Sequence, residues 1–595
     1  NRIIELKNSF SQRKYFEYDA MGNIIKETDS MGHETIYKYS LGGKLISVLD
    51  AMGNRTEYGY DKVGRLITVY RHEGDKELLT SIKSYKAYEE EKLETGNTPR
   101  LTRYKRDLMG NILSVTNALG HEETFSYDLL GRPVGKKDGE GYETTYSYTQ
   151  AGDIKSILYG DGSSVEYTYN SLRQLIQIKD ALGTIEIESD KFGRATKVVD
   201  YQGEEVNYTY GKNGERLKIA YPDGKSVSYE YDKYLRLTSL TLGNKRVDYY
   251  YDKEGRLIRK DMPDDVSSIY EYNERGLLSG LSHLKGNKKL EEYIYAYDLL
   301  GNKTKIVKYR DVSEKGIKDG NKEEIIHRLW QDSGIFNYSY DSLNRLVEVK
   351  RGDKLLHKYT YDAFGNRILL KNDDKEIRYT YDALDRLIKE GGLQGSKTYE
   401  YDKRGNLTSI TDRGRKIRAY EYDAKGRLGL SYSFLGEARC YSYDGIGNRI
   451  GIKEYEFERE GFGENKLKDI SELNLIQKDP IYEEEYILDR TRAYNNLLQN
   501  KVIKRENKTV QSYAWDFNAV FVEEDKKEFT YLQDELGSII RLLEVESEGQ
   551  MIYGYDEFGK DTYNTQGGMQ PFGYTGYRYD NVADTYFAQA LSLIH

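Results

Sequence analysis

The chain has 595 residues and a net charge of −9, with 90 basic and 99 acidic residues spread along its whole length. This balance leaves no basic surface for binding nucleic acid. The sequence contains no window of about 18 apolar residues, so no transmembrane helix is predicted. A single cysteine excludes a disulfide framework within the chain. The 59 tyrosines favour a thin sheet with water near both faces, because a tyrosine ring packs while its hydroxyl stays hydrated.

From the N-terminus onward the chain repeats a turn signal at short, regular intervals. Turn glycines fall at positions 22, 32, 43, 53 and 64, which are 10 or 11 residues apart. A strand of about six residues followed by a turn of about four fits this spacing, and regular short strands are typical of all-β folds. The pattern therefore predicts an all-β chain with one hairpin per repeat, over residues 1–455.

Two charged segments interrupt the repeat. They span about 74–103 and about 309–336, and we expect loops or short helices there, on the outside of the sheet. Elsewhere prolines are rare, with six in the whole chain, which agrees with a sheet that needs nearly every backbone N–H for its ladder.

The repeat is clearest from 340 to 449, where six near copies of YxYDxxGRL follow one another every 20 or 21 residues. The Asp can accept hydrogen bonds from backbone N–H groups of the turn, and Gly or Asn three residues later tolerates positive φ. The Tyr and Leu positions are expected to pack across the hairpin and build the wall. The copies contribute Tyr340 and Asp341; Tyr361, Asp362 and Gly365; Tyr381, Asp382 and Arg386; Tyr401, Asp402 and Gly405; Tyr422, Asp423 and Gly426; and Tyr443, Asp444 and Gly447.

After the repeat, residues 456–512 are interpreted as an insertion. Ile487, Tyr494, Leu497 and Leu498 are spaced as on one face of a helix, which predicts a helix over about 483–501. Strand-like sequence resumes at about 513 and continues to 590, through the phrases YLQDELGSIIRLL, YGYDEFGK and PFGYTGYRYD.

The YD phrases followed by these three C-terminal phrases resemble the bacterial Rhs and YD-repeat family, which is related to the C component of Tc toxins and to teneurins. In the resemblance, residues 513–590 correspond to part of the Rhs-associated core domain. The matching core residues are Asp534, Gly537, Arg541, Tyr555, Asp556, Gly559, Pro571, Gly573, Tyr574, Gly576 and Asp580.

The resemblance implies a strip of hairpins that spirals into a hollow shell around a C-terminal toxin, secreted or displayed by a bacterium. The enclosed partner would be the chain's own toxin domain, with an export apparatus or a target-cell surface as further partners. The family's aspartyl autoprotease motifs do not follow Ala590. We therefore expect a C-terminally truncated, non-catalytic scaffold.

The last five residues, LSLIH at 591–595, are also the translation of CTGTCTCTTATACAC, a transposon-end adapter used to prepare DNA libraries. We expect them to be a non-native tail. A genomic sequence that encodes LSLIH followed by a stop would contradict this.

The sequence lacks the motifs of metal-binding, nucleotide-binding and hydrolase sites. Calcium β-rolls need several oxygen ligands within nine residues, whereas each hairpin here offers one turn Asp, and the seven histidines show no metal-binding spacing. Neither a Walker loop nor a GxSxG elbow is present, so no metal, cofactor or catalytic residue is predicted. The alternative to a toxin shell is a cell-wall or surface adhesin whose tyrosine faces bind carbohydrate.

Overall fold

The computed structural model describes residues 2–8, 12–71, 100–311, 322–393, 395–433, 435–456, 479–492, 496–504, 507–563, 570–587 and 592–593. The first strands are β1 Glu5–Lys7, β2 Arg13–Tyr18, β3 Ile24–Thr28, β4 Glu34–Tyr39, β5 Leu45–Leu49, β6 Arg55–Tyr60, β7 Leu66–Arg71, β8 Arg100–Arg106, β9 Ile112–Thr116, β10 Glu122–Tyr127, β11 Pro133–Lys137, β12 Glu143–Tyr148, β13 Ile154–Leu158, β14 Ser164–Tyr169, β15 Leu175–Asp180 and β16 Gly183–Ser189. Those that follow are β17 Ala195–Val199, β18 Glu205–Tyr210, β19 Arg216–Ala220, β20 Ser226–Tyr231, β21 Leu237–Leu242, β22 Lys245–Tyr251, β23 Leu257–Met262, β24 Val266–Tyr272, β25 Leu278–Lys285, β26 Lys288–Tyr297, β27 Lys303–Arg310, α2 Lys322–Gln331, β28 Gly334–Tyr340, β29 Leu346–Arg351, β30 Lys354–Tyr361, β31 Arg367–Lys371 and β32 Glu376–Tyr381.

The remaining elements complete the sheet and add a small C-terminal one. They are β33 Leu387–Gly392, β34 Gly395–Tyr401, β35 Leu407–Asp412, β36 Arg415–Tyr422, β37 Leu428–Ser433, β38 Glu437–Tyr443, β39 Arg449–Glu456, β40 Tyr482–Leu488, β41 Leu497–Lys504, β42 Asn507–Trp515, β43 Ala519–Glu524, β44 Lys527–Gln533, β45 Ile539–Glu544, β46 Gln550–Ile552, the 3-10 turn η3 Tyr574–Gly576, β47 Arg578–Asp580, β48 Thr585–Phe587 and β49 Ser592–Leu593.

One antiparallel ladder joins β1 to β46, and each strand pairs with the next strand along the chain. The predicted all-β fold is thus confirmed, as a sheet of 46 strands. Among the described strands, β1 pairs with β2 at one end and β46 with β45 at the other. The sheet is therefore an open strip rather than a closed barrel.

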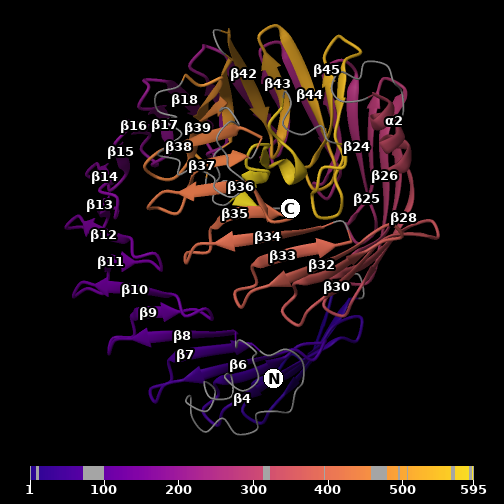
Figure 1. Ribbon diagram of the computed structural model, residues 1–595. Helices are drawn as coiled ribbons and strands as arrows, with labels where there is room; N and C mark the ends of the chain where they lie inside the picture. Colours follow the sequence, from indigo (N-terminus) through magenta and orange to yellow (C-terminus); the bar gives the residue numbers. More distant parts are fainter. Residues whose placement is uncertain are drawn as a thin grey trace.

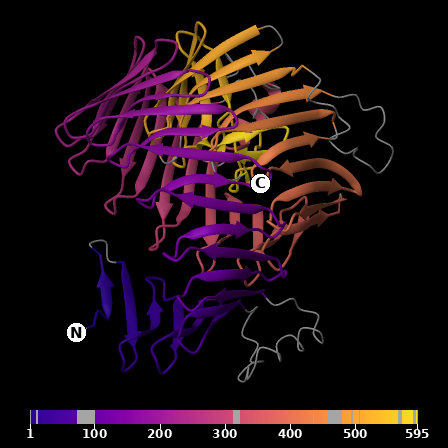
Figure 2. The ribbon, with the colours of Figure 1, turned by 90° about the vertical axis from the view of Figure 1, so that its left-hand side faces the viewer.

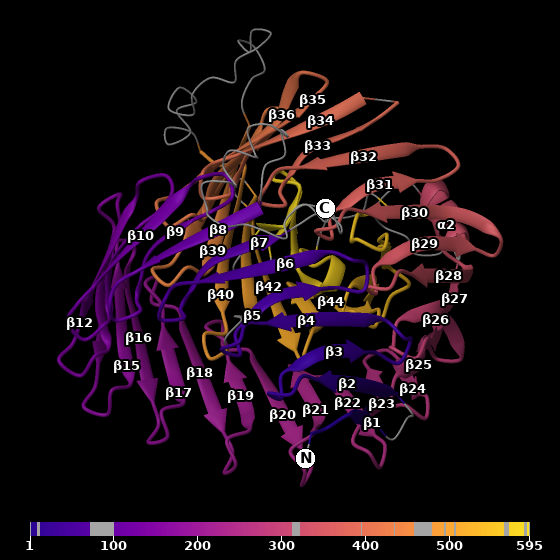
Figure 3. The same ribbon diagram turned by 90° about the horizontal axis from the view of Figure 1, so that it is seen from below.

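The strip winds around itself, so that strands distant in sequence face one another (Figure 1 and Figure 3). The N-terminal strands form one end of the winding, and the C-terminal segment lies within it (Figure 2). Side chains face alternately inward and outward: in β32 the ring of Tyr379 is 8% exposed, while its neighbours Arg378 and Thr380 are exposed. This is the alternation that a pleated strand produces when one face is covered.

Successive windings meet along a line of turns, called the seam below. The first winding contributes turns that lie midway between its YD turns, within residues 8–225. They contact YD turns and strand ends of the second winding, within residues 298–515. Side chains form these contacts, whereas backbone ladders join the strands within a winding. The seam pairs, first winding first, are Gln12 with Leu299, Ala51 with Ser342, Glu140 with Lys403, Tyr142 with Arg404, Tyr159 with Lys425, and Tyr221 with Tyr513.

The predicted helix over 483–501 is wrong. Residues 482–488 form β40 and residues 497–504 form β41, which pair with each other, and β42 continues the same ladder. The described part of the proposed 456–512 insertion is therefore sheet. Ile487 and Leu488 are both buried, as are Leu497 and Leu498. A strand that buries side chains on both faces carries a continuous apolar run, and such a run also matches helical spacing.

The two predicted insertions have different outcomes. Within 309–336 the chain forms α2, the one α-helix among the described residues, and residues 312–321 lie outside them. Of the 74–103 segment, residues 100–103 belong to β8, and the rest lies outside the described part of the chain. No helix among the described residues is long and apolar enough to cross a membrane.

Candidate functional site

Each YD turn is closed by its aspartate. In the copy at 382, one carboxylate oxygen of Asp382 accepts the backbone N–H groups of Leu384 at 2.8 Å and Arg386 at 3.1 Å. The other accepts the Arg386 side chain Nε at 2.6 Å. Asp341, Asp362, Asp402, Asp423 and Asp444 accept the equivalent backbone N–H four residues later.

The third position after the aspartate adopts a left-handed backbone. Gly365, Gly405, Gly426 and Gly447 have φ of 90°, 93°, 77° and 96°. Asn344 and Asp385 occupy the same place in their repeats with φ of 61° and 64°. Asn and Asp tolerate this region better than other residues with a Cβ, which explains why the motif varies at this position.

The motif arginine links one repeat to the next. Arg386 donates from Nη1 to the carbonyl oxygen of Asp402 at 3.2 Å, and its guanidinium carbon lies 4.7 Å from the centre of the Tyr401 ring. Tyr401 in turn donates its hydroxyl to the carbonyl of Leu387 at 2.9 Å. The same arginine-to-tyrosine stacking joins Arg345 to Tyr361 and Arg427 to Tyr443.

The motif tyrosines are half-buried wall residues. Tyr340, Tyr361 and Tyr381 donate their hydroxyls to carbonyl oxygens of neighbouring strands, while Tyr443 receives a hydrogen bond from Arg449. Burial raises the pKa of Tyr381 and of Tyr401 to about 12. Burial likewise raises the pKa of Tyr422. The repeat residues lie in separate hairpins and do not converge on one point.

The core-motif residues that line a cavity fall into two groups: Asp534, Tyr555, Asp556 and Tyr574 line one cavity, and Pro571 and Asp580 line another. Asp534 and Asp556 close turns as the YD aspartates do, with Gly537 and Gly559 at positive φ. Gly573 precedes η3 and Gly576 ends it, and the Tyr574 ring of η3 lies 5.8 Å from that of Tyr555. The Pro571 carbonyl accepts the Tyr579 N–H at 2.9 Å, and Asp580 pairs with Arg439 at 3.0 Å.

A buried ionic network joins the described part of residues 513–590, called the core segment below, to the earlier strands of the wall. Arg541 of β45 donates to Glu291 of β26 from Nε at 2.9 Å and from Nη2 at 2.7 Å, and both side chains are fully buried. Arg310 of β27 donates to the other Glu291 oxygen at 2.9 Å and to the Tyr553 carbonyl at 3.0 Å. The two guanidinium charges hold the pKa of Glu291 below its usual value despite its burial.

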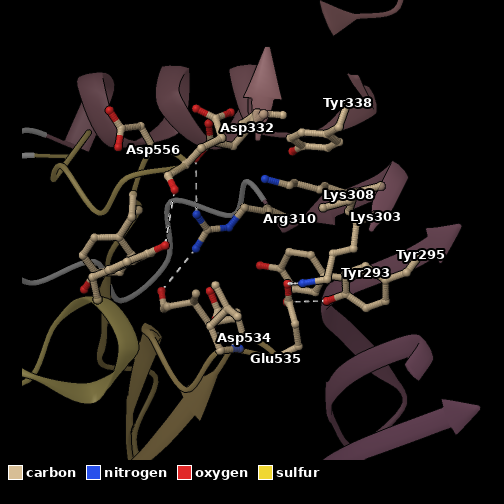
Figure 4. A pocket seen from close by; sticks show the side chains of 18 of the residues that line it. Tyr293, Tyr295, Lys303, Lys308, Arg310, Asp332, Tyr338, Asp534, Glu535 and Asp556 are labelled. Carbon is tan, nitrogen blue, oxygen red and sulfur yellow. Dashed lines mark hydrogen bonds and ion pairs between the residues drawn. The ribbon is translucent and has the colours of Figure 1, made fainter. Parts of the chain in front are cut away.

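Beside this network lies a polar cavity of about 260 Å³ (Figure 4). Tyr295, Lys303 and Lys308 enter it from the wall, and Asp534 and Glu535 enter it from the core segment. Tyr295 donates its hydroxyl to Glu535 at 2.6 Å, and Lys303 forms an ion pair with the same carboxylate. Burial, aided by the adjacent Glu535 charge, raises the pKa of Asp534 to about 6.

The Asp534 and Glu535 carboxylates of this cavity already have partners. Glu535 is committed to Lys303 and Tyr295, and an oxygen of Asp534 accepts the N–H groups of Leu536 and Ser538. Across the described ranges, no three His, Cys, Asp or Glu side chains are grouped so that they could hold a metal ion. The arrangement is suited to holding the core segment against the wall.

Further polar contacts join the core segment to the wall. Asp516 accepts from Lys260 at 2.7 Å and from Tyr249 at 3.0 Å, in a buried position. His357 lies 3.2 Å from Glu557 through Nδ1. Sequence reasoning identified Arg541, but it missed Glu291 and Arg310. The only feature of the sequence that could have indicated these two residues is a charged side chain at an inward-facing position of a strand.

The comparisons with known proteins agree with this architecture. The family model "Teneurin YD-shell" matches residues 87–262 and 318–460, and the model "RHS Repeat" matches residues 39–75. The chain is 30% identical over 257 residues to the "tRNA3(Ser)-specific nuclease WapA" of Bacillus spizizenii, covering 40% of this chain and 11% of that protein. It is 25% identical over 285 residues to the "Double-stranded DNA deaminase toxin A" of Burkholderia cenocepacia, covering 40% of this chain and 17% of that protein.

Among solved structures, the TcdB2-TccC3 complex superposes with a TM-score of 0.68 at 14% identity, covering 99% of this chain and 33% of that chain. This likeness concerns the fold. The family model, in contrast, matches more than half of the chain's sequence, in the region where the YD turns and their arginine links recur. The chain therefore belongs to the teneurin YD-shell family and carries the RHS repeat.

Proposed function

We propose that this chain is a non-catalytic wall that encloses a C-terminal toxin domain and helps to deliver it in bacterial competition or pathogenesis. The observation that carries the proposal is the path of the C-terminal segment. Tyr420 of β36 donates its hydroxyl to the carbonyl of Ala583 at 2.8 Å, and Arg439 of β38 pairs with Asp580. The C-terminal ribbon, yellow in Figure 1, lies within the winding, so a polypeptide that continues from it would begin there.

The names of the relatives support a toxin as cargo. One is called a nuclease and another a deaminase toxin, and this chain spans 11% and 17% of their lengths. We infer that their activities belong to parts without a counterpart here. Enclosure by the wall would keep such an activity from the producing cell. The toxin domain is then the main partner, and a secreted or surface location with an export apparatus follows from this role.

Protease protection tests the proposal. A protease-sensitive reporter peptide is fused after His595, and the matched control carries the same peptide before Asn1, at the end of the winding where the N-terminal strands lie (Figure 2). We expect cleavage of the C-terminal reporter to be at least tenfold slower than cleavage of the N-terminal one. Equal rates at native pH, with full cleavage of both after unfolding, would contradict enclosure.

Two further measurements separate the alternatives. Prolonged incubation should leave the purified chain intact, and a discrete C-terminal cut would contradict a non-catalytic wall. A surface adhesin would bind carbohydrate on a glycan array and would give its C-terminal reporter no protection. That pair of results would favour the adhesin over the toxin shell.

A further inference from the structure

A second cavity, of about 820 Å³, lies between β38–β44 and residues 570–581. It is larger than the cavity of Figure 4 and contains none of that cavity's lining residues. Arginines from two elements enter it, Arg449 from β39 and Arg578 from β47. Arg449 follows the last YD turn and Arg578 lies in the phrase PFGYTGYRYD, and neither belongs to the Glu291 network.

These two guanidinium groups lack a carboxylate partner in the described part of the chain. Arg449 is 5% exposed, and its one side-chain hydrogen bond there runs from Nη2 to the Tyr443 hydroxyl at 3.3 Å. Its buried Nε has no hydrogen-bond partner, and neither has the buried Nη1 of Arg578. An unpaired buried charge is unfavourable, because its hydration is lost without compensation, so such groups normally meet an anion.

Both guanidinium groups lie on the same aromatic ring. Their central carbons are 3.9 Å and 5.0 Å from the centre of the Phe587 ring, for Arg449 and Arg578 respectively. Arg578 also lies 4.4 Å from the ring centre of Tyr486. A guanidinium group over an aromatic ring is attracted to the ring without using its N–H groups, which can still donate hydrogen bonds to a ligand.

Four acidic side chains line the cavity, and each has another partner. Glu524 accepts a hydrogen bond from the Gln511 side chain at 3.5 Å. Asp580 and Glu454 both pair with Arg439. Glu484 accepts hydroxyl hydrogen bonds from Tyr482 and Tyr486. Asp580 also accepts the backbone N–H of Ala583 at 2.9 Å. Among the described residues, therefore, none of these carboxylates lies within ion-pair distance of Arg449 or Arg578.

We propose that Arg449 and Arg578 form a carboxylate-binding site within this cavity. Two guanidinium forks held on aromatic faces suit planar carboxylates, which accept paired N–H groups, better than tetrahedral anions. The ligand is either a small organic dicarboxylate or an acidic side chain of a polypeptide that enters the cavity. The site is independent of the proposed toxin cargo, because it rests on these two side chains alone.

The test uses the full chain with defined probes. Succinate, sulfate, an acetylated and amidated Gly-Asp-Gly-Asp-Gly peptide and its Asn counterpart are titrated, and both the midpoint of thermal unfolding and the heat of binding are measured. We expect saturable stabilisation by succinate or by the Asp peptide, and none by the Asn peptide. Stronger stabilisation by succinate identifies a small-molecule site, and stronger stabilisation by the Asp peptide identifies a polypeptide site. Absence of saturable binding by both, or tighter binding of sulfate, overturns the proposal.

Variants assign the binding to the two arginines. We expect Arg578→Gln to weaken the affinity for the bound carboxylate at least tenfold and Arg578→Lys to weaken it less, because the lysine keeps the charge and loses the fork. The control Arg246→Gln changes a side chain that is 49% exposed on β22 and should leave binding unchanged. Arg578→Gln also removes a half-buried charge that has no carboxylate within ion-pair distance, so without ligand its unfolding midpoint should not fall below that of the wild type. Unchanged affinity in a folded Arg578→Gln variant would overturn the assignment.

Discussion

Arg541 and Glu291 are 250 residues apart in the chain, yet they form a two-point ion pair with N–O distances of 2.7 and 2.9 Å. One belongs to the core segment and the other to the wall. Both side chains have zero exposure, and Arg310 completes the network on the opposite carboxylate oxygen. The core segment is thus held by charge at a place where water cannot compete.

Glu291→Gln should strongly destabilise the attachment of the core segment. The substitution leaves Arg541 buried without a compensating charge and leaves Arg310 with Asp332 alone, at 3.5 Å. Breaking such a buried pair costs about 3–5 kcal/mol. Urea unfolding followed by tryptophan fluorescence measures the loss. The control is Glu292→Gln on the same strand, where the side chain is 30% exposed and pairs with Lys289. A loss at position 291 no larger than at position 292 would contradict the network's role.

Arg386→Gln should weaken the link between two repeats. The variant loses the ion pair to Asp382, the hydrogen bond to the Asp402 carbonyl and the contact with the Tyr401 ring. We expect a loss of about 1–2 kcal/mol, since each contact is partly screened by water. Arg386→Lys should recover less than half of it, because lysine lacks the planar fork. Arg378→Gln, at a side chain that is 74% exposed, is the control and should change stability by less than about 0.5 kcal/mol.

Gly365→Ala should destabilise its turn through the backbone alone. Gly365 has φ of 90°, and a Cβ placed there would meet nothing within 4 Å. The left-handed conformation then accounts for a cost of about 1–2 kcal/mol. Gly365→Asn should cost less, because Asn344 already adopts positive φ at the equivalent position. If alanine and asparagine cost the same in chemical denaturation, backbone conformation is not the cause.

Asp534→Asn should change the pH dependence of stability. Because the pKa of Asp534 is raised to about 6, the folded protein binds this proton more tightly than the unfolded chain does. Below about pH 4 this carboxyl therefore does not lower the free energy of unfolding. As pH rises through 6, it lowers the free energy of unfolding by about 2–3 kcal/mol. The variant should gain stability relative to the wild type over that interval.

The comparison with Asp534→Asn isolates this carboxyl from an opposing group. Burial lowers the pKa of His283 to about 4, so that histidine favours folding more as pH rises from 4 to 6.5. In the wild type the effects of Asp534 and His283 on the free energy of unfolding therefore partly cancel. The difference in unfolding free energy between variant and wild type, measured by urea titration from pH 4 to pH 7, removes the histidine contribution. A difference that stays constant over this range would contradict the raised pKa.

The hairpins were predictable because their determinants are local. An aspartate that caps a turn and a glycine or asparagine at positive φ act within five residues, and the pairing of Tyr381 with Leu387 follows from the turn between them. The strand from Tyr482 was misread as helical because its inward and outward faces are both covered near Leu488. Burial on both faces removes the alternation that distinguishes a strand.

The contacts that hold the core segment to the wall could not be predicted in this way. Glu291 stands in a strand among other charged residues, and nothing near it in sequence distinguishes it from the exposed Lys289. Its role arises when the strip winds and brings β45 against β26. The core phrases supplied Arg541 through resemblance, whereas its partner becomes visible only in three dimensions.

The seam has a consequence for how the wall comes apart. Along the strip each of the strands β1 to β46 is joined to its chain neighbour by backbone hydrogen bonds. The windings are held together by side chains instead, through polar contacts such as Lys403 with Glu140 and Tyr221 with Tyr513 and through a buried apolar cluster that includes Val227 and Phe521. Opening the seam exposes few backbone amides and breaks no ladder. The lowest-energy fluctuation should therefore be a parting of the windings that leaves the hairpins folded. Such a breach would admit solvent to the interior, and amide hydrogen exchange would remain slow throughout it.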